Sequence, residues 1–300
     1  MAKISKILAI ANPLVALSED PLSVGQAACD RGAQVAEMLG ASLRLHAVVY
    51  EPSANFDLFH IADEDHVRHQ FREDAQALLD RLAARYAKEG LADVDTSTQW
   101  AHPFDRGVIG AVELDWPDVV MITARNAQRL SPAEWRLLHS CEIPVWLVRD
   151  EPWPDPARIA AFVDPAHRSA HRSQADREVL NWTLALHNQL GDAHLMHAIQ
   201  QIPGEGLDDD MQDYLAEVKA QREAEITRLL PGDGSVKLPI EIAPGEPEIL
   251  MRDFAQEDDA ALVVMGVFSR SRLADLLIGS TAREVLPDLP CDVLAVPADR

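Results

Sequence analysis

Short apolar runs alternate with longer amphipathic stretches along the whole chain. The apolar runs that resemble strands are residues 7–11, 119–122, 159–163 and 262–265. The stretches with helical spacing of apolar residues are 26–39, 66–88, 177–190 and 211–230. Continuous apolar runs are typical of strands buried on both faces of a sheet. Their alternation with helices of this length predicts an α/β fold with parallel sheets.

The second half of the sequence repeats the first. Residues 6–13, Lys-Ile-Leu-Ala-Ile-Ala-Asn-Pro, match residues 158–165, Arg-Ile-Ala-Ala-Phe-Val-Asp-Pro. Three further matches follow in the same order: His46 with His197, Pro103 and Met121 with Pro247 and Met265 at one spacing of 18, and Cys141 with Cys291. Equal order and spacing indicate a duplication, which places the two histidines at equivalent strand positions.

We therefore predict two tandem, doubly wound domains, each with five parallel strands. The first spans residues 1–150 and the second spans 157–300. Residues 151–156 form the proline-rich linker between them, because alternating prolines continue neither a helix nor a central strand. Ligands of such sheets bind beyond the carboxyl ends of the strands. Asp164 and Gly266 fall there in the second domain.

The second domain carries a candidate phosphate loop. An apolar strand ends at Gly266, and a turn with Ser269, Arg270 and Arg272 leads to Gly279-Ser280-Thr281. Backbone N–H groups at a glycine turn and at a helix start can converge on one phosphate, and the arginines can neutralise its charge. The matching loop of the first domain is six residues shorter and contains no glycine. We expect the first domain to be structural. Both Ser131 and Thr281 precede a glutamate by three residues, which predicts two capped helices.

The loop resembles the nucleotide-binding loop of the universal stress protein family, Gly-x2-Gly-x9-Gly-Ser/Thr, with Ser269 in place of the second glycine. The tandem layout, Ser131-Pro-Ala-Glu-Trp and Asp150-Glu-Pro-Trp-Pro are similar to its tandem, E-type members. The resemblance implies a Rossmann-like fold of the HUP type, a pseudo-dimer formed within one chain, and a non-enzymatic, cytoplasmic role in stress resistance. It also implies ATP or AMP at Asp164, Gly266, Ser269, Gly279 and Ser280, with Thr281 directly after them.

Composition narrows the alternatives. A formal charge of −22 disfavours sequence-independent binding to nucleic acid. No stretch approaches the roughly 20 apolar residues of a membrane helix. Three cysteines without metal-ligand spacing predict buried free thiols. His60, Asp63, His66 and His69 could hold zinc, but a solvated helix face is the favoured interpretation, and no metal is predicted.

Two further functions remain open. One is an adaptor that binds another small ligand, either apolar or a nucleotide-sugar. The other is a slow ATP-cleaving enzyme of the same fold, although the sequence shows no nucleophile paired with a base. The expected partners are a small-molecule nucleotide and, as one option, a second copy of the chain.

Overall fold

The computed structural model describes ten segments of the chain. They are residues 3–12, 26–50, 64–124, 129–166, 170–187, 189–199, 209–230, 237–257, 260–267 and 279–297. These residues divide into two compact units. The first half holds the described residues from Ile4 to Asp150 except Arg129, and the second half holds those from Glu151 onward.

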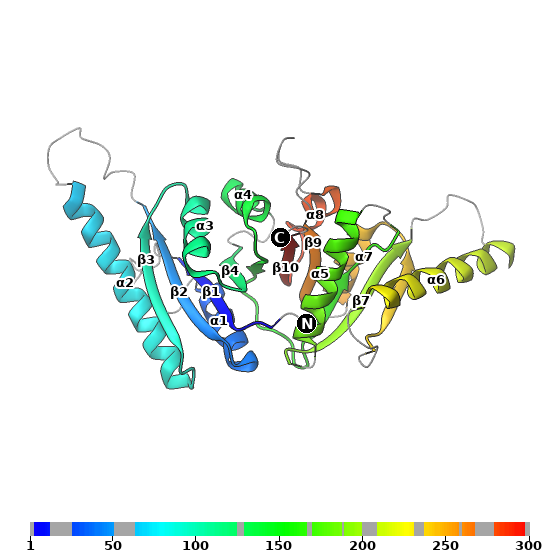
Figure 1. Ribbon diagram of the computed structural model, residues 1–300, viewed down its shortest axis with the longest axis horizontal. Helices are drawn as coiled ribbons and strands as arrows, with labels where there is room; N and C mark the ends of the chain where they lie inside the picture. The colour runs from blue at the N-terminus through cyan, green and yellow to red at the C-terminus, as the bar shows by residue number, and fades with distance from the viewer. Residues whose placement is uncertain are drawn as a thin grey trace. The chain divides into compact units, whose positions relative to one another are not determined.

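The first half is a five-stranded parallel sheet with helices on both faces (Figure 1). Its elements are β1 (Lys6–Ala11), α1 (Ala27–Leu39), β2 (Ser42–Val49), α2 (Glu64–Glu89), β3 (Val94–Trp100), α3 (Phe104–Asp115), β4 (Val119–Thr123), α4 (Pro132–Ser140) and β5 (Val145–Val148). The strand order is β3-β2-β1-β4-β5. Because β1 lies in the middle, right-handed crossovers direct α1 and α2 to one face and α3 and α4 to the other.

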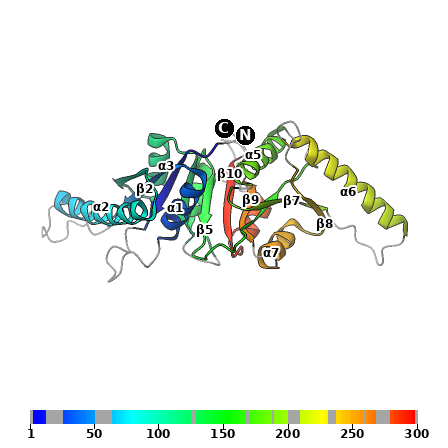
Figure 2. The same ribbon diagram turned by 90° about the horizontal axis from the view of Figure 1, so that it is seen from below.

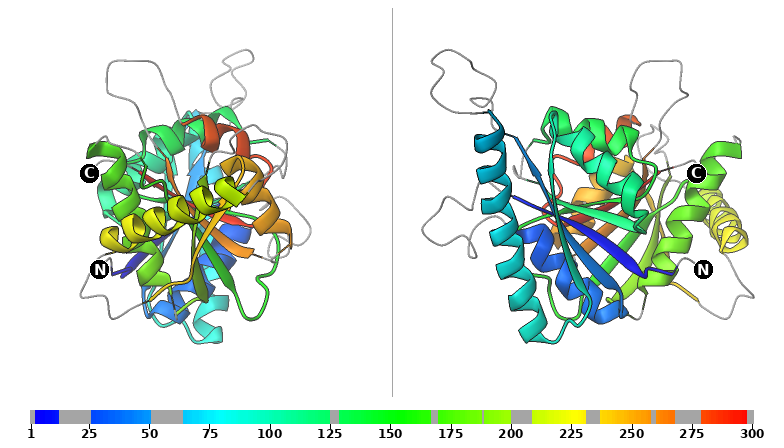
Figure 3. Two further views of the ribbon diagram at one scale, coloured as in Figure 1. Left: turned by 90° about the vertical axis from the view of Figure 1, so that its right-hand side faces the viewer. Right: turned by 60° about the vertical axis from the view of Figure 1, so that its left-hand side comes forward.

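Side chains along β2 show these two faces. A Cβ built at Gly32 of α1 would lie 3.1 Å from Leu43, and one built at Gly107 of α3 would lie 2.5 Å from Val48. Positions 43 and 48 are an odd number of residues apart, so their side chains point to opposite faces. Helix α2 lies along one face of the sheet (Figure 3). Its Leu78, Leu79 and Leu82 are fully buried.

The second half repeats this architecture. Its elements are β6 (Arg158–Phe162), α5 (Ala170–Leu186), β7 (Asp192–Ile199), α6 (Asp209–Leu229), β8 (Ile240–Pro244), α7 (Pro247–Glu257), β9 (Ala260–Val267), α8 (Ser280–Val285) and β10 (Asp292–Pro297). The strand order is β8-β7-β6-β9-β10, the same as in the first half, and all of the pairings are parallel. The predicted fold class, two doubly wound five-stranded sheets, is confirmed.

Three of the four predicted helices agree closely with the structure, including 211–230, which differs from α6 by one or two residues at each end. The stretch 26–39 becomes α1 with Gln26 at its N-cap, and 66–88 lies within α2. The stretch 177–190 was placed too late, because α5 ends at Leu186. In the second half, α6 covers the sheet less completely than α2 does (Figure 2): Ile226 is its buried residue among those whose side chains are described.

Hydrogen bonds fasten segments that are distant in sequence. Asp118 Oδ2 accepts from the backbone N–H of Ser5 and Lys6, at 2.7 and 2.9 Å. These contacts fix the start of β1 beside the start of β4.

In the predicted linker, the Trp153 indole donates to the buried carboxylate of Asp292 at 3.1 Å, so this residue is anchored to the second half. The three cysteines are free and buried, as predicted.

The contact of α3 with the sheet gives a test of the packing. In Gly107→Ala, the new methyl group would meet Val48 Cγ1 at 2.5 Å and Ala101 Cβ at 3.0 Å. Such overpacking costs about 1–3 kcal/mol. In the control Gly110→Ala, the nearest atom is the flexible Gln99 amide nitrogen at 3.4 Å. Alanine is a better helix former there by up to about 1 kcal/mol.

We expect urea unfolding, followed by circular dichroism, to show a lower midpoint for Gly107→Ala and an unchanged or higher midpoint for Gly110→Ala. Equal midpoints for the two variants would contradict the close contact between α3 and β2.

Candidate functional site

Two predicted site residues meet at the carboxyl edge of the second-half sheet. β6 and β9 pair in parallel, with Phe162 opposite Met265. Asp164 follows Phe162 by two residues and Gly266 follows Met265 by one. Both therefore lie at the edge where parallel sheets bind ligands.

Asp164 is held by two hydrogen bonds. Its backbone N–H donates to Asp176 Oδ1 at 3.1 Å. Its own Oδ1 accepts the N–H of Ala166 at 3.2 Å, which is the contact of an Asx turn. The Asp164 side chain is nevertheless 45% exposed. The carboxylate thus shapes the turn after β6 and still presents part of its surface to solvent.

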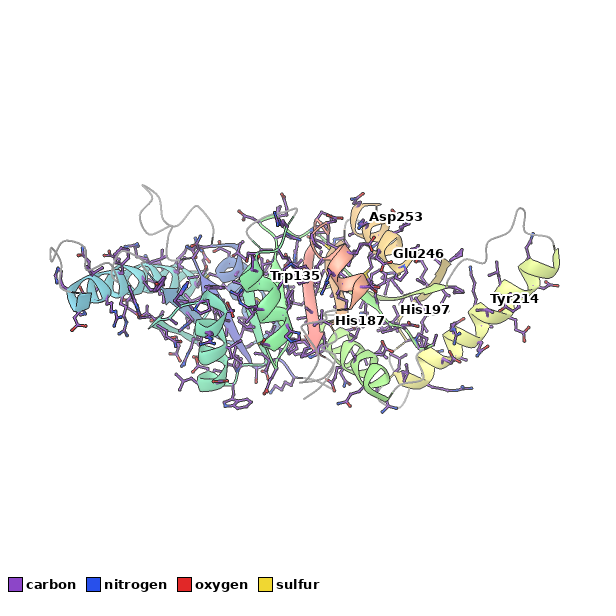
Figure 4. All side chains as sticks on the ribbon, turned by 90° about the horizontal axis from the view of Figure 1, so that it is seen from above. Trp135, His187, His197, Tyr214, Glu246 and Asp253 are labelled. Atoms are coloured by element: carbon purple, nitrogen blue, oxygen red, sulfur yellow. The ribbon has the colours of Figure 1, made fainter. Side chains whose placement is uncertain are left out.

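His197 of β7 lies buried next to this turn (Figure 4). Its Nδ1 is 3.0 Å from the Val163 carbonyl oxygen and 3.9 Å from Asp164 Oδ1. Burial lowers the pKa of His197 and outweighs the opposite influence of Val163 and Asp164. The ring is therefore neutral at pH 7, and Nδ1–H donates to the Val163 carbonyl. Arg222 and Glu225 of α6 form an ion pair at 2.6 Å and also act on the ring electrostatically.

The glycine-containing loop is described only at its two ends. Gly266 is the next-to-last residue of β9, opposite Val296 of β10. Gly279 is the N-cap of α8, and its carbonyl accepts the N–H of Arg283 at 3.0 Å. Ser269, Arg270 and Arg272 lie outside the described residues.

One expectation about the start of α8 is corrected. Thr281 is not the N-cap: α8 begins at Ser280, so Thr281 lies inside the helix. Gly279 has a φ of −51° and a ψ of 149°, which any residue can adopt, so the conformation does not require glycine. What glycine does provide is a helix start without a side chain. Ser280 is exposed, and Thr281 is partly exposed.

The corresponding edge of the first half shares one contact with the second half and adds another. At the first-half position of Asp164, the backbone N–H of Asn12 donates to Gln26 Oε1 at 3.2 Å, as that of Asp164 does to Asp176. In addition, the N–H of Ala28, in the first turn of α1, donates to Thr123 Oγ1 at the end of β4, at 3.0 Å. Ser131 forms the predicted capping box with Glu134 at the start of α4.

Sequence reasoning missed Gln26 and Asp176. Each is a buried polar residue near a helix start that bonds back to the Asx residue after the first strand of its half. The available signal was a polar residue 14 or 12 positions after Asn12 or Asp164. The buried face of a helix is expected to be apolar, so a polar residue on it indicates a hydrogen-bond partner.

Comparisons with known proteins agree with this geometry. Residues 169–297 match the model of the universal stress protein family. Universal stress protein E from Salmonella typhi is 25% identical over 93% of this chain and 92% of its own length. The protein of that name from Escherichia coli K12 is 24% identical over 94% of this chain and 92% of its own. The second half of the chain thus carries a universal stress protein domain, at residues 169–297.

Solved structures of low sequence identity share the fold of this chain. A universal stress protein from Archaeoglobus fulgidus aligns with a TM-score of 0.62, at 17% identity, over 99% of this chain and 100% of that chain. A Pseudomonas aeruginosa protein described as functionally unknown aligns with a TM-score of 0.70, at 20% identity, over 98% of this chain and 92% of that chain. The tandem arrangement is therefore shared along nearly the whole length.

The predicted equivalence of His46 and His197 is wrong. Ile10, two residues before Asn12, pairs with His46, whereas Phe162, two residues before Asp164, pairs with Met196. A shift by one residue along a strand turns the side chain to the opposite face of the sheet. The two rings accordingly contact different groups: His46 Nδ1 lies 2.9 Å from Ser97 Oγ, whereas His197 Nδ1 lies 3.0 Å from the Val163 carbonyl oxygen.

The structure describes only part of the group formed by His60, Asp63, His66 and His69. His60 and Asp63 lie outside the described residues, and His69 pairs with Glu73 on α2 at 3.1 Å. Among the described residues, no three His, Cys, Asp or Glu side chains are placed to hold a metal ion. No described helix combines the length and the apolar character needed to span a bilayer.

The buried histidine of the first half gives a test by pH. Burial lowers the pKa of His46 from 6.5 to about 4. Between these two values the unfolded chain binds more protons than the folded chain, so stability falls as the pH drops from 6.5 toward 4. The slope contributed by one such group is at most about 1.4 kcal/mol per pH unit. The variant His46→Gln lacks this contribution.

Urea midpoints measured at pH 7, 6 and 5 should fall less steeply for His46→Gln than for the wild type. His69→Gln is the control, because the His69 side chain is 72% exposed. A wild-type slope retained in His46→Gln would contradict the neutral, buried state of this ring.

Proposed function

We propose that this protein binds an adenine nucleotide, ATP or AMP, at the carboxyl edge of its second-half sheet, and that its first half is structural. The observation that carries the proposal is the convergence of a half-exposed carboxylate, Asp164, with the strand end that carries Gly266. The universal stress protein domain at residues 169–297 supports the same place on the fold.

Asp164 is suited to the sugar or the base. A carboxylate accepts hydrogen bonds from ribose hydroxyls or from an adenine amine. The Asp176 carboxylate fixes its backbone by accepting its N–H, and the neutral ring of His197 donates to the carbonyl of the preceding residue, Val163. Little rearrangement would be needed on binding, which favours affinity.

The phosphates would lie between the two described ends of the loop. At Gly266 the backbone can approach an anion without a Cβ in the way. Gly279, Ser280 and Thr281 offer a helix start with hydroxyl groups, and Ser269, Arg270 and Arg272 complete the proposed set from sequence alone. The Ser269 replacement reduces the match to the family loop.

The proposed role is binding and not catalysis. His197 is neutral but buried with its Nδ1 occupied, so it is not placed to act as a base on a bound phosphate. We infer a cytoplasmic function in stress resistance, with the chain acting alone or as a homodimer. An adaptor for an apolar ligand or a nucleotide-sugar is the second candidate, since the same edge would also receive those.

Calorimetry with ATP, ADP and AMP tests the proposal. The wild type should give saturable heat at sub-millimolar nucleotide. Gly279→Asp places a carboxylate where phosphate is expected and should weaken binding at least about tenfold, because like charges repel at short range. Pro132→Asp adds the same charge at the start of α4 in the first half and should leave the affinity unchanged.

Absence of heat with all three nucleotides would overturn the proposal. Equal losses in Gly279→Asp and Pro132→Asp would also contradict it, because the effect would then be one of overall charge. Multiple-turnover phosphate release that is lost in Gly279→Asp would favour the ATP-cleaving alternative.

A further inference from the structure

The first half carries an aromatic cluster of its own at the carboxyl ends of β2 and β3. We define it as Tyr50, Trp100 and His102, together with Arg68. The rings of Tyr50 and His102 are stacked, with centroids 4.1 Å apart and planes 18° apart. The Trp100 ring lies 5.9 Å from Tyr50, and the Arg68 guanidinium lies 5.5 Å from the Trp100 ring.

Strand pairing brings these residues together. Val49, the last residue of β2, pairs with Trp100, the last residue of β3. The N–H of Ala101 continues the ladder by donating to the Val49 carbonyl at 3.1 Å. Tyr50 directly follows Val49 and His102 directly follows Ala101, so both rings lie at the ligand-binding edge of the sheet.

The second half has the same backbone contact without the rings. There the N–H of Gly245 donates to the Ile199 carbonyl at 2.9 Å, and Ile199 pairs with Pro244. Pro244, Gly245 and Glu246 thus take the places of Trp100, Ala101 and His102. The second half therefore joins these two strand ends without aromatic residues, so the fold does not require the cluster.

The cluster has an exposed end. His102 is exposed, whereas Trp100 and Tyr50 are partly buried. Stacked rings extend by adding another flat ring, so a planar ligand can add to the stack on the His102 side.

We propose that the aromatic cluster is a binding site for a flat, fused-ring compound, which stacks on His102. This site is separate from the nucleotide site of the second half and gives the first half a ligand-binding role instead of a purely structural one. The stacking face supplies the selectivity for flat rings.

The probe is 2-naphthoate, titrated into the full chain and followed by calorimetry and by quenching of tryptophan fluorescence. We expect saturable binding of 2-naphthoate and at least tenfold weaker binding of cyclohexanecarboxylate, which has the charge without the flat rings. His102→Glu copies Glu246 of the second half and should weaken 2-naphthoate at least about tenfold, the scale of losing one aromatic stacking contact. His69→Glu makes the same change at an exposed histidine of α2 and should have no effect.

Gly279→Asp separates this proposal from the nucleotide proposal, because it should weaken nucleotide binding and leave 2-naphthoate binding intact. Equal binding of the two carboxylates, equal affinity of His102→Glu and His69→Glu, or no saturable binding of 2-naphthoate would each overturn the aromatic site.

Discussion

The parallel pairing of the two central strands, β1 and β6, with both of their neighbours is the constraint on which the rest of the structure depends. Parallel pairing aligns all carboxyl ends at one edge, and it buries both faces of the central strands, which requires their apolar sequence. Polar residues can then appear only where each strand ends. Asn12 and Asp164 occupy those positions, and each is fixed by a buried side chain from the following helix, Gln26 or Asp176.

Duplication lets the two halves keep this scaffold and change its edge. In the first half, Thr123 Oγ1 accepts an amide of α1, and aromatic rings stand at the ends of β2 and β3. In the second half, β9 carries Gly266 near its end, and Gly245 and Glu246 replace Ala101 and His102. The core contacts are alike while the edge residues differ in size, charge and ring content. This is the pattern expected when the fold is conserved physically and the ligands are not.

The sequence predicted what depends on pattern and missed what depends on register. Period and apolar runs were sufficient for the strands, the doubly wound order and α1, because burial on both faces leaves few alternatives. The repeated blocks wrongly predicted equivalent positions for His46 and His197, because similar residue types were aligned. Ile10 pairs with His46, whereas Phe162 pairs with Met196, which is an offset of one residue. The start of α8 was also misplaced, because a hydroxyl residue followed by glutamate occurs inside helices as well as at their caps. The partners of Asp164 could not be found from sequence, since hydrogen bonds between buried polar residues leave no periodic signal.

The strong negative charge bears on the proposed nucleotide, which is itself an anion. A formal charge of −22 would repel it if it acted as a whole. At physiological salt, however, exposed charges are screened beyond about 8 Å, so a bound anion senses mainly the groups within one or two side chains of it. In the second half those groups include the half-exposed Asp164, which suits a ribose or a base better than a phosphate, and the Arg222–Glu225 pair, whose charges cancel at a distance. The acidic surface therefore slows the approach of an anion more than it weakens the bound state, and local geometry determines whether the anion is retained.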